Sequence, residues 1–278
     1  MMNMSSTYAG KFSLVTGGSS GMGKALAKAL VQLGGSVIIA ARNEERLAQA
    51  KDEIAPIVSG TSFVETMQAD MSDEAQVKNA FDEMIASHGV PDFLFNCVGA
   101  AEPGYIQDFS IAQYEKAMKQ DYFSYIIPTM YLLPRFIERG SGYVVNISSA
   151  LGFMGIIGYG TYAPAKFAVV GFSEVLRHEM KPKGIHVSVV CPPDTDTPGF
   201  HEENKHKPEE CKIVSAHGKV IQAEDVARAI IEGVAKQRFY ILPGDTKFFY
   251  NMKRLFPGLV FSTIDGDLKK ALKKLGKL

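Results

Sequence analysis

The sequence of 278 residues has few cysteines, no excess of either charge and no long apolar run. Its three cysteines are too few, and odd in number, for a disulfide framework. Cys97 and Cys191 lie in short apolar segments, which favours buried thiols in a reducing compartment. Thirty basic and thirty acidic side chains give a formal net charge of zero, which argues against a nucleic-acid-binding protein. We therefore expect a cytoplasmic protein that does not bind nucleic acid.

Segments long enough to cross a membrane are also lacking. The longest uncharged stretch, residues 140–165, is interrupted by Gly, Ser, Asn and Pro, and the apolar run 255–264 is too short. The first ten residues have neither the basic nor the apolar region of a secretory signal. Because 46% of the residues are hydrophobic and only 22% are charged, the chain is too apolar for intrinsic disorder. We expect a folded protein without a transmembrane anchor.

Strand-like and helix-like segments alternate along the chain. The expected strands are short and apolar or alternating, at residues 12–16, 36–40, 61–68, 92–96, 143–148, 185–191 and 239–242. Helical patterns separate them, among them residues 21–33, 43–54 (with Asn43 as N-cap), 72–88 and 223–236. Such alternation predicts a single doubly wound α/β domain, with a parallel sheet of about seven strands and helices on both faces.

Two regions depart from this alternation. Residues 194–222 are polar, and a connection of that length inside a compact domain is usually a binding loop or a lid. We therefore predict a catalytic domain over residues 1–246 that includes a substrate loop at 194–222. A metal site at His201, His206, Cys211 and His217 is not expected, because their spacing fits no zinc signature.

The second region is a basic extension, residues 247–278. It holds eight Lys/Arg and two Asp/Glu, a net charge of +6, so residues 1–246 carry a net charge of −6. A helical stripe of apolar side chains runs along its end, at Leu268, Ala271, Leu272 and Leu275. Two alternatives remain open: the stripe packs on its own domain or a partner subunit, or the extension lies on an anionic membrane surface, with Phe256, Leu259, Val260 and Phe261 as further contacts.

A glycine-rich turn joins the first strand to the first long helix, in the sequence Thr16-Gly17-Gly18-Ser19-Ser20-Gly21-Met22-Gly23. Glycines permit a tight turn, a close approach of backbone amides to a phosphate, and close packing of the helix on the sheet. The positive end of the helix then favours an anion. This turn predicts a dinucleotide site with contacts from Gly17, Ser19, Ser20, Gly21, Met22 and Gly23.

Arg42 follows the second strand. In proteins that bind NAD, the residue at this position is usually an Asp or Glu that hydrogen-bonds the ribose 2′-hydroxyl. A guanidinium suits a 2′-phosphate, so the sequence favours NADP(H) over NAD. Asp70 follows the third strand, and two alternatives remain open: it accepts a hydrogen bond from the adenine amino group, or it caps the next helix.

Tyr162 and Lys166 are four residues apart and so lie on one face of an expected helix. A phenol acts as an acid–base group near neutral pH when a cation lies close, and Lys166 supplies that cation. Ser149, thirteen residues earlier, follows a buried strand and is placed to hydrogen-bond a substrate oxygen. Tyr159 is an alternative to Tyr162 as the acid, but no lysine follows it by four residues. Ser148 is an alternative to Ser149, but strand alternation predicts that it points to the opposite face.

The segments TGGSSGMG, NCVG, ISSA and YAPAK occur in this order, and over residues 10–245 the chain resembles the short-chain dehydrogenase/reductase superfamily. The resemblance implies a Rossmann domain with strand order 3-2-1-4-5-6-7, and a homodimer or homotetramer. It implies that Asn96 stabilises the central strand and that Ser149, Tyr162 and Lys166 are catalytic. It also implies further cofactor contacts from Met71, Asn96, Val98, Gly99, Tyr162, Lys166, Pro192, Thr195 and Thr197.

One position departs from the superfamily pattern. Asp121, 28 residues before Ser149, replaces the asparagine that usually joins a proton relay to the lysine. The resemblance places Asp121 among the catalytic residues, and its charge is expected to perturb Lys166.

The segments PPDTDTPGFHEENKHKPEE, ARNEERL and YAPAKFAVVGFSEVLRHEMKP are similar to the 3-ketodihydrosphingosine reductases. This implies NADPH-dependent reduction of a long-chain β-keto lipid in sphingolipid synthesis. The alternatives are a reductase of 3-oxoacyl thioesters or of a steroid or retinoid ketone, and a non-catalytic NADP-binding scaffold. Eukaryotic members usually carry membrane-spanning segments, so for this chain we expect at most peripheral contact, through residues 247–278, with the cytoplasmic face of a membrane.

Overall fold

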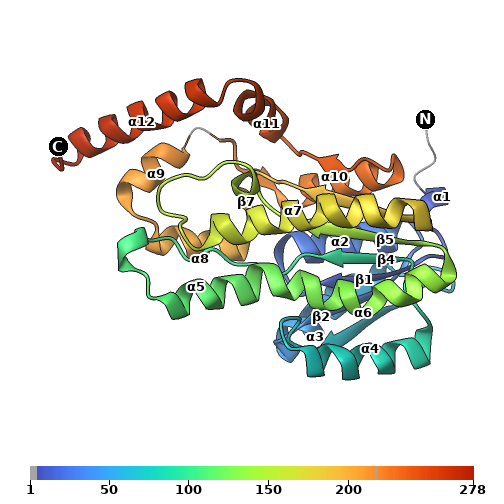
Figure 1. Cartoon of the computed structure of the whole chain (residues 1–278). Helices are drawn as coiled ribbons and strands as arrows, with labels where there is room; N and C mark the ends of the chain where they lie inside the picture. The colour runs from blue at the N-terminus through green and yellow to red at the C-terminus, as the bar shows by residue number, and fades with distance from the viewer. Residues whose placement is uncertain (1–4, 217) are drawn as a thin grey trace.

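A seven-stranded parallel sheet forms the centre of the computed structural model, which describes residues 5–216 and 218–278 (Figure 1). Its strand order is β3-β2-β1-β4-β5-β6-β9, which confirms the predicted order, with β9 as the seventh strand. The strands are β1 (Phe12–Thr16), β2 (Ser36–Ala41), β3 (Val64–Gln68), β4 (Phe93–Asn96), β5 (Gly142–Ile147), β6 (Ile185–Val190) and β9 (Tyr240–Ile241).

Helices cover both faces of the sheet, because the side chains on both faces of the central strands are apolar. Val15, Ile39 and Val145 pack against one layer, formed by α2 (Gly21–Gln32), α3 (Glu44–Ile54) and α10 (Ala223–Ala235). Leu14, Ile38 and Val144 pack against the other, formed by α4 (Glu74–His88), α6 (Ser124–Arg139) and α7 (Tyr162–Met180). The prediction of a doubly wound α/β domain is confirmed.

Shorter elements connect these layers. The α-helical ones are α1 (Ser5–Tyr8) and α5 (Ile111–Met118). A π-helical turn, η3 (Lys119–Phe123), joins α5 to α6. The 3₁₀ turns are η1 (Ala55–Ile57), η2 (Ile106–Asp108), η4 (Ala150–Gly152) and η5 (Lys181–Lys183).

Caps define the starts of two helices beside the sheet. The Asn43 side chain accepts a hydrogen bond from the amide of Arg46 at 2.7 Å, as predicted for the N-cap of α3. Helix α4 begins two residues later than predicted, because its N-cap is Asp73, which accepts from the amide of Gln76 at 3.0 Å. Asp70 therefore does not cap α4, and that alternative is excluded.

Regular elements form within residues 194–216 and 218–222, where the sequence predicted a loop, while the role of this segment in substrate binding stays a prediction. Two short parallel strands, β7 (Thr195–Asp196) and β8 (Ile221–Gln222), enclose α8 (Pro198–His206) and α9 (Glu209–Ser215). Thr197 starts α8, since its hydroxyl accepts from the amide of Phe200 at 3.1 Å and a proline follows it. Helix α9 buries Cys211, whose thiol donates to the carbonyl of Ile157 at 3.0 Å.

The basic extension forms α11 (Thr246–Leu255) and α12 (Pro257–Lys274), with α12 beside α9 (Figure 1). The predicted apolar stripe faces the protein, since Ala271 is 1% exposed and Leu268, Leu272 and Leu275 are partly buried. Lys277 adds an ion pair to Glu210 at 3.0 Å. The stripe thus packs on its own domain. These side chains are therefore not available for contact with a membrane.

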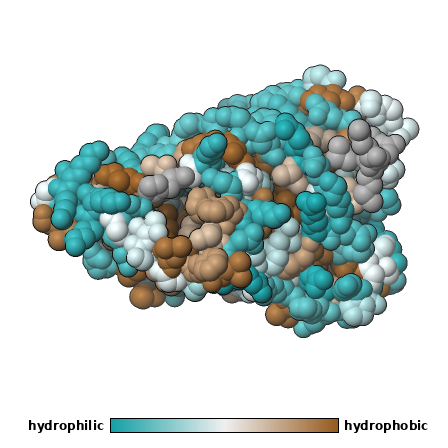
Figure 2. Space-filling model, turned by 90° about the horizontal axis from the view of Figure 1, so that it is seen from above, coloured by the Kyte–Doolittle hydropathy of each residue, from teal (hydrophilic) through white to brown (hydrophobic). Residues whose placement is uncertain are grey.

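Other apolar side chains of the extension stay exposed. Around the turn between α11 and α12 these are Leu255, Phe256, Leu259 and Phe261, and Phe248 is exposed near the start of α11. Figure 2 shows apolar side chains on the face of the molecule that carries these two helices. Within the two described ranges, no helix combines the length and apolarity that crossing a membrane requires.

Candidate active site

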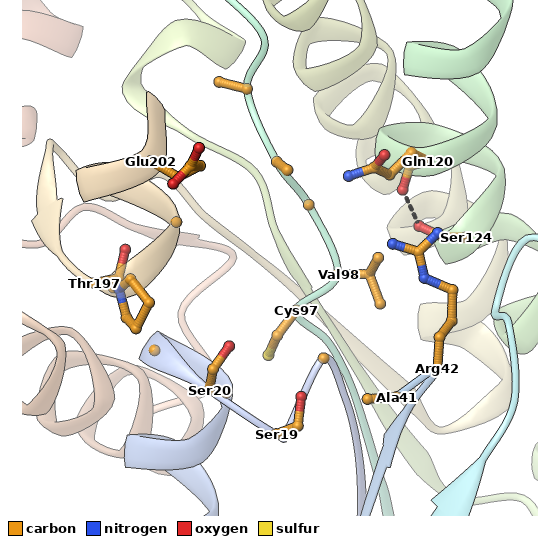
Figure 3. Close-up of a pocket in the computed structure, with 18 of the residues that line it drawn as sticks. Ser19, Ser20, Ala41, Arg42, Cys97, Val98, Gln120, Ser124, Thr197 and Glu202 are labelled. Carbon is orange, nitrogen blue, oxygen red and sulfur yellow. Dashed lines mark hydrogen bonds between the residues drawn. The ribbon is translucent and has the colours of Figure 1, made fainter. Parts of the chain in front are cut away.

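The carboxyl ends of β1 to β4 surround a cavity of about 1060 Å³, here called the larger cavity. The strand order reverses between β1 and β4, and connections leaving a parallel sheet on opposite faces open a crevice at such a point. In Figure 3, Ser19, Ser20 and Cys97 lie between Arg42 on one side and Thr197 and Glu202 on the other.

The glycine-rich turn forms the floor of the larger cavity with all of its predicted contact residues. Gly17 has φ of +69°, and a Cβ there would lie 2.8 Å from the carbonyl carbon of Cys97. A Cβ on Gly23 would lie 2.3 Å from the carbonyl oxygen of Gly17, so only glycine lets α2 start this close to the turn. Ser20 precedes α2 without a side-chain cap, so the first amides of α2 remain available to an anion. The cradle fits the pyrophosphate of a dinucleotide.

Two arginines stand at the far side of the larger cavity. Arg42 is 66% exposed, and its nearest guanidinium nitrogen lies 4.0 Å from the carboxylate of Asp70. Arg46, in the first turn of α3, lines the same cavity and was not among the predicted cofactor-binding residues. Because Arg42 and Arg46 are four residues apart at the start of a helix, their spacing indicated that both side chains lie on the same side. Asp70 accepts hydrogen bonds from the backbone amide and hydroxyl of Ser72, at 2.9 and 2.7 Å.

A smaller cavity of about 130 Å³ adjoins the larger one, and Met22, Val98, Gly99 and Thr197 line both. Its wall brings together residues far apart in the sequence that were predicted to act together: Ser149, Tyr162, Lys166, Pro192 and Thr195. Met71 lines the larger cavity only. The two cavities therefore place a nucleotide-sized space directly beside a phenol, a lysine and a serine.

Ser149 and Tyr162 face each other across the smaller cavity. Ser149 follows β5, and its hydroxyl accepts from the amide of Leu151 at 3.1 Å and also hydrogen-bonds the Tyr162 phenol. Ser148 also lines this cavity, but it is 2% exposed and its hydroxyl donates to the carbonyl of Lys166 at 2.9 Å. The rival phenol of Tyr159 donates to Glu203. The geometry therefore favours Ser149 and Tyr162 over both rivals.

Lys166 lies one helical turn after Tyr162 and is 2% exposed. Its ammonium donates to the Tyr125 hydroxyl at 2.9 Å, lies 3.3 Å from the Asp121 carboxylate, and is 5.5 Å from the centre of the Tyr162 ring. Burial lowers the pKa of Lys166, and the charge of Asp121 acts against that shift.

The pKa of Tyr162 is raised, although Lys166 was expected to lower it. Burial is the main cause, and the negative charges of Asp121 and Glu203 add to it. The hydrogen bond with Ser149 lowers the pKa in part. Because the Lys166 ammonium is matched by the adjacent carboxylate of Asp121, its charge does not reverse the effect of burial.

Asp121 sits in the π-helical turn η3 and is 1% exposed. It accepts from the amide of Ala100 at 3.1 Å and contacts Lys166 directly. Burial raises the pKa of Asp121, and the adjacent Lys166 charge opposes the shift. Tyr125, which our sequence analysis missed, follows Asp121 by four residues and completes the shell around Lys166. The spacing of Asp121 and Tyr125 was a signal for a shared partner.

Asn96 lines neither cavity. It is fully buried, and its amide donates to Asn146 on the neighbouring strand at 2.9 Å and to Thr129 of α6 at 3.2 Å. Asn96 thus ties β4 to β5 and to the helix behind them. A contact of its side chain with a cofactor stays a prediction.

The His and Cys residues of the 194–222 segment do not form a metal centre in the described parts of the chain. His201 pairs with Asp196 at 2.8 Å, and Cys211 is buried under α9. His217 lies outside the described residues.

The parallel sheet, the glycine cradle and the Tyr162–Lys166 pair define an oxidoreductase that uses a nicotinamide cofactor on a ketone or alcohol. Residues 11–208 match the family model described as short chain dehydrogenase, and the chain belongs to this family. It is 34% identical to the 3-ketodihydrosphingosine reductase of Dictyostelium discoideum, over 97% of this chain and 91% of the relative.

A second relative, the 3-dehydrosphinganine reductase of Danio rerio, is 37% identical over 81% of this chain and 69% of its own length. Among solved structures, a short-chain dehydrogenase of Burkholderia phymatum in complex with NAD superposes with a TM-score of 0.79. The match covers 91% of this chain and 95% of that one at 24% identity, and it shows a shared fold.

Proposed function

We propose that the protein reduces the ketone of 3-ketodihydrosphingosine, or of a closely similar long-chain β-keto lipid, with NADPH. The observation that carries the proposal is the adjoining pair of cavities, one with a phosphate cradle and one with Ser149 and Tyr162 on its wall. The relatives named 3-ketodihydrosphingosine reductase support the choice of substrate.

When bound, the reduced nicotinamide supplies a hydride to the carbonyl carbon. Ser149 donates a hydrogen bond to the carbonyl oxygen and orients it. Tyr162 transfers its proton to that oxygen, which yields the secondary alcohol, and the resulting phenolate regains a proton from solvent. Because the pKa of Tyr162 is raised by burial, the phenol holds this proton throughout the neutral range.

Lys166 and Asp121 act behind the phenol. The Lys166 ammonium, held between Asp121 and Tyr125, offsets the negative charge that develops on Tyr162 during proton transfer. Lys166 also lines the smaller cavity, and its ammonium would hold a ribose hydroxyl of the bound cofactor. The charge of Asp121 opposes the lowering of the Lys166 pKa by burial.

The preference for NADPH over NADH rests on Arg42 and Arg46. Both line the larger cavity near the end of β2, where an adenosine ribose lies in a doubly wound nucleotide site. Two guanidinium groups suit a dianionic 2′-phosphate, and Asp70, which follows β3 and lines the same cavity, would accept a hydrogen bond from the adenine amino group.

We propose further that the exposed apolar turn between α11 and α12 rests on the cytoplasmic face of an anionic membrane, from which a lipid substrate is taken. Exposed Phe256, Leu259 and Phe261 stand beside Lys253 and Arg254, and the extension carries a net charge of +6. We also propose that the protein forms a homodimer or homotetramer. Light scattering on the purified protein measures this oligomeric state.

The decisive experiment follows NADPH oxidation by the purified protein with 3-ketodihydrosphingosine, a 3-oxoacyl thioester and a steroid ketone. We expect turnover of the first substrate, and a loss of about 10²-fold or more in kcat for a Tyr162→Phe protein that still binds NADPH. Faster turnover of the thioester or steroid ketone would replace the substrate assignment. Tight NADPH binding with no turnover of any ketone would indicate a non-catalytic scaffold.

A further inference from the structure

The smaller cavity contains an acidic side chain that the reduction step does not use. Asp194 lies between β6 and β7, and its backbone carbonyl accepts from the amide of Ile221 at 3.1 Å, which holds this main chain in place. Its side chain is half-buried and lines the cavity. Among the described residues, its carboxylate has no hydrogen-bond donor and no basic nitrogen within 4.0 Å.

Asp194 shares its surroundings with the reacting phenol. Tyr162 and Ser149 line the same cavity of about 130 Å³, and the negative charge of Asp194 contributes to the raised pKa of Tyr162. The carboxylate therefore lies within electrostatic reach of the atom that receives or gives the proton. Burial raises the pKa of Asp194 itself, and the charge of Lys207 opposes that shift.

A second acidic residue of the cavity, Glu203, differs because the protein already neutralises it. The Lys207 ammonium, 2% exposed, lies 3.1 Å from Glu203, and the Tyr159 hydroxyl donates to the same carboxylate. Lys207 also lies over the rings of Tyr159 and Phe200, at 5.5 and 5.3 Å from their centres. Because Lys207 contacts Glu203 directly and acts on Asp194 only at longer range, Asp194 is left without a partner of its own among the described residues.

A half-buried carboxylate without a partner costs free energy, which a cationic ligand would recover. We propose that Asp194 binds the ammonium group of an α-amino ketone and so makes the enzyme prefer such substrates to plain ketones. This inference rests on the proposed function, because 3-ketodihydrosphingosine carries an ammonium on the carbon next to its ketone. Only two bonds separate that nitrogen from the carbonyl carbon, so both groups fit one small cavity.

The test compares two substrates with three forms of the full-length protein. The substrates are 3-ketodihydrosphingosine and its deamino analogue, which keeps the chain, the ketone and the terminal hydroxyl. For Asp194→Asn we expect kcat/KM for the amino ketone to fall about 10- to 100-fold, mainly through KM, since a hydrogen bond to a charged group is lost. The deamino analogue should change by less than about threefold, because it has no cation for Asp194 to bind.

Asp196→Asn is the matched control in the same stretch. Asp196 pairs with His201 at 2.8 Å and lines neither cavity, so both substrates should keep their wild-type values within about twofold. Asp194→Glu retains the charge and should retain the preference for the amino ketone.

The outcomes separate this inference from the proposed function. A wild-type protein that reduces neither substrate overturns the proposed function, and this inference with it. A wild-type protein that reduces both equally well overturns the inference alone, whether or not the variants fold. An equal loss for both substrates in a folded Asp194→Asn protein, checked by thermal unfolding, would show that Asp194 acts only on the structure of the site.

Discussion

The ammonium of Lys166 lies 3.3 Å from the carboxylate of Asp121, and neither side chain is more than 2% exposed. The Tyr125 hydroxyl accepts from the same ammonium at 2.9 Å. Two charges from different helices are thereby fixed directly behind Tyr162. A buried pair of this kind adds little net stability, but it is costly to break, because the remaining charge is left without a partner.

Replacing Asp121 by Asn should therefore destabilise the protein by about 3 kcal/mol at neutral pH. Urea unfolding measures this loss. The double variant Asp121→Asn/Lys166→Met removes both charges and should recover most of the stability while remaining inactive. A single variant as stable as the wild type would show that the pair does not carry opposite charges.

The difference in unfolding free energy between the wild type and Asp121→Asn should become smaller as the pH rises from 7 to 10. Burial lowers the pKa of Lys166 below its ordinary value of 10.5, and loss of Asp121 lowers that pKa further. The folded variant then binds fewer protons than the unfolded chain between the two pKa values, so its stability increases with pH. Unfolding at several pH values, with the wild type beside the variant, checks the sign.

Gly99 is a sensitive position beside this pair. A Cβ there would lie 2.8 Å from the Asp121 carboxylate and 2.9 Å from the Lys166 ammonium. Gly99→Ala should displace the lysine and lower kcat by about tenfold or more, since misplacing a catalytic group by an ångström costs up to about 10²-fold.

Gly171→Ala is the control for Gly99→Ala. Gly171 is exposed in the middle of α7, and a Cβ there meets no atom within 4 Å. Alanine should stabilise the helix by about 0.5–1 kcal/mol and leave kcat unchanged. Equal activity of the two alanine variants would contradict the tight packing around Lys166.

The surroundings of Lys166 show where sequence patterns reach their limit. Periodicity predicted the parallel sheet, and the resemblance to the superfamily implied its strand order. Strand ends and helical spacing predicted that Ser149, Tyr162 and Lys166 meet in space. The π-helical turn η3 carries no simple sequence signal. The resemblance led us to expect that Asp121 acts on Lys166, but the direct contact at 3.3 Å depends on this turn and was not predicted.

The segment 194–222 and the tail show a second limit. Both are polar or basic, and their helices form because they cover other surfaces: Ala271 is buried where α12 lies on α9. In the tail the apolar stripe predicted a helix, but nothing in the sequence identified α9 as the surface that this helix covers. The unpaired state of Asp194 likewise depends on which side chains surround it in the fold.

Cofactor preference should depend on Arg42 and Arg46. Each alanine substitution should raise KM for NADPH about tenfold, because an exposed hydrogen bond between charged groups is worth about 1.5 kcal/mol. The KM for NADH should change by less than about twofold. Initial rates with both cofactors measure the ratio.

Lys51→Ala provides the matched control for these arginines. Lys51 lies on the same helix, α3, but lines neither cavity, so removing its charge should leave both KM values unchanged. A loss of NADH and NADPH binding by the same factor in Arg42→Ala would show that the arginine does not read a 2′-phosphate.

Membrane contact, finally, should depend on the exposed turn between α11 and α12 rather than on the buried stripe. Deleting residues 247–278 would uncover α9, so point substitutions are the sharper test. Leu259→Ser/Phe261→Ser should weaken binding to vesicles of phosphatidylserine and phosphatidylcholine by at least about tenfold, since each apolar side chain is worth about 1.5–3 kcal/mol when buried. Ile111→Ser, which removes an equally exposed apolar side chain on α5, should not. Co-sedimentation at low and high salt measures binding, and unchanged binding of the double variant would remove the membrane from the proposed function.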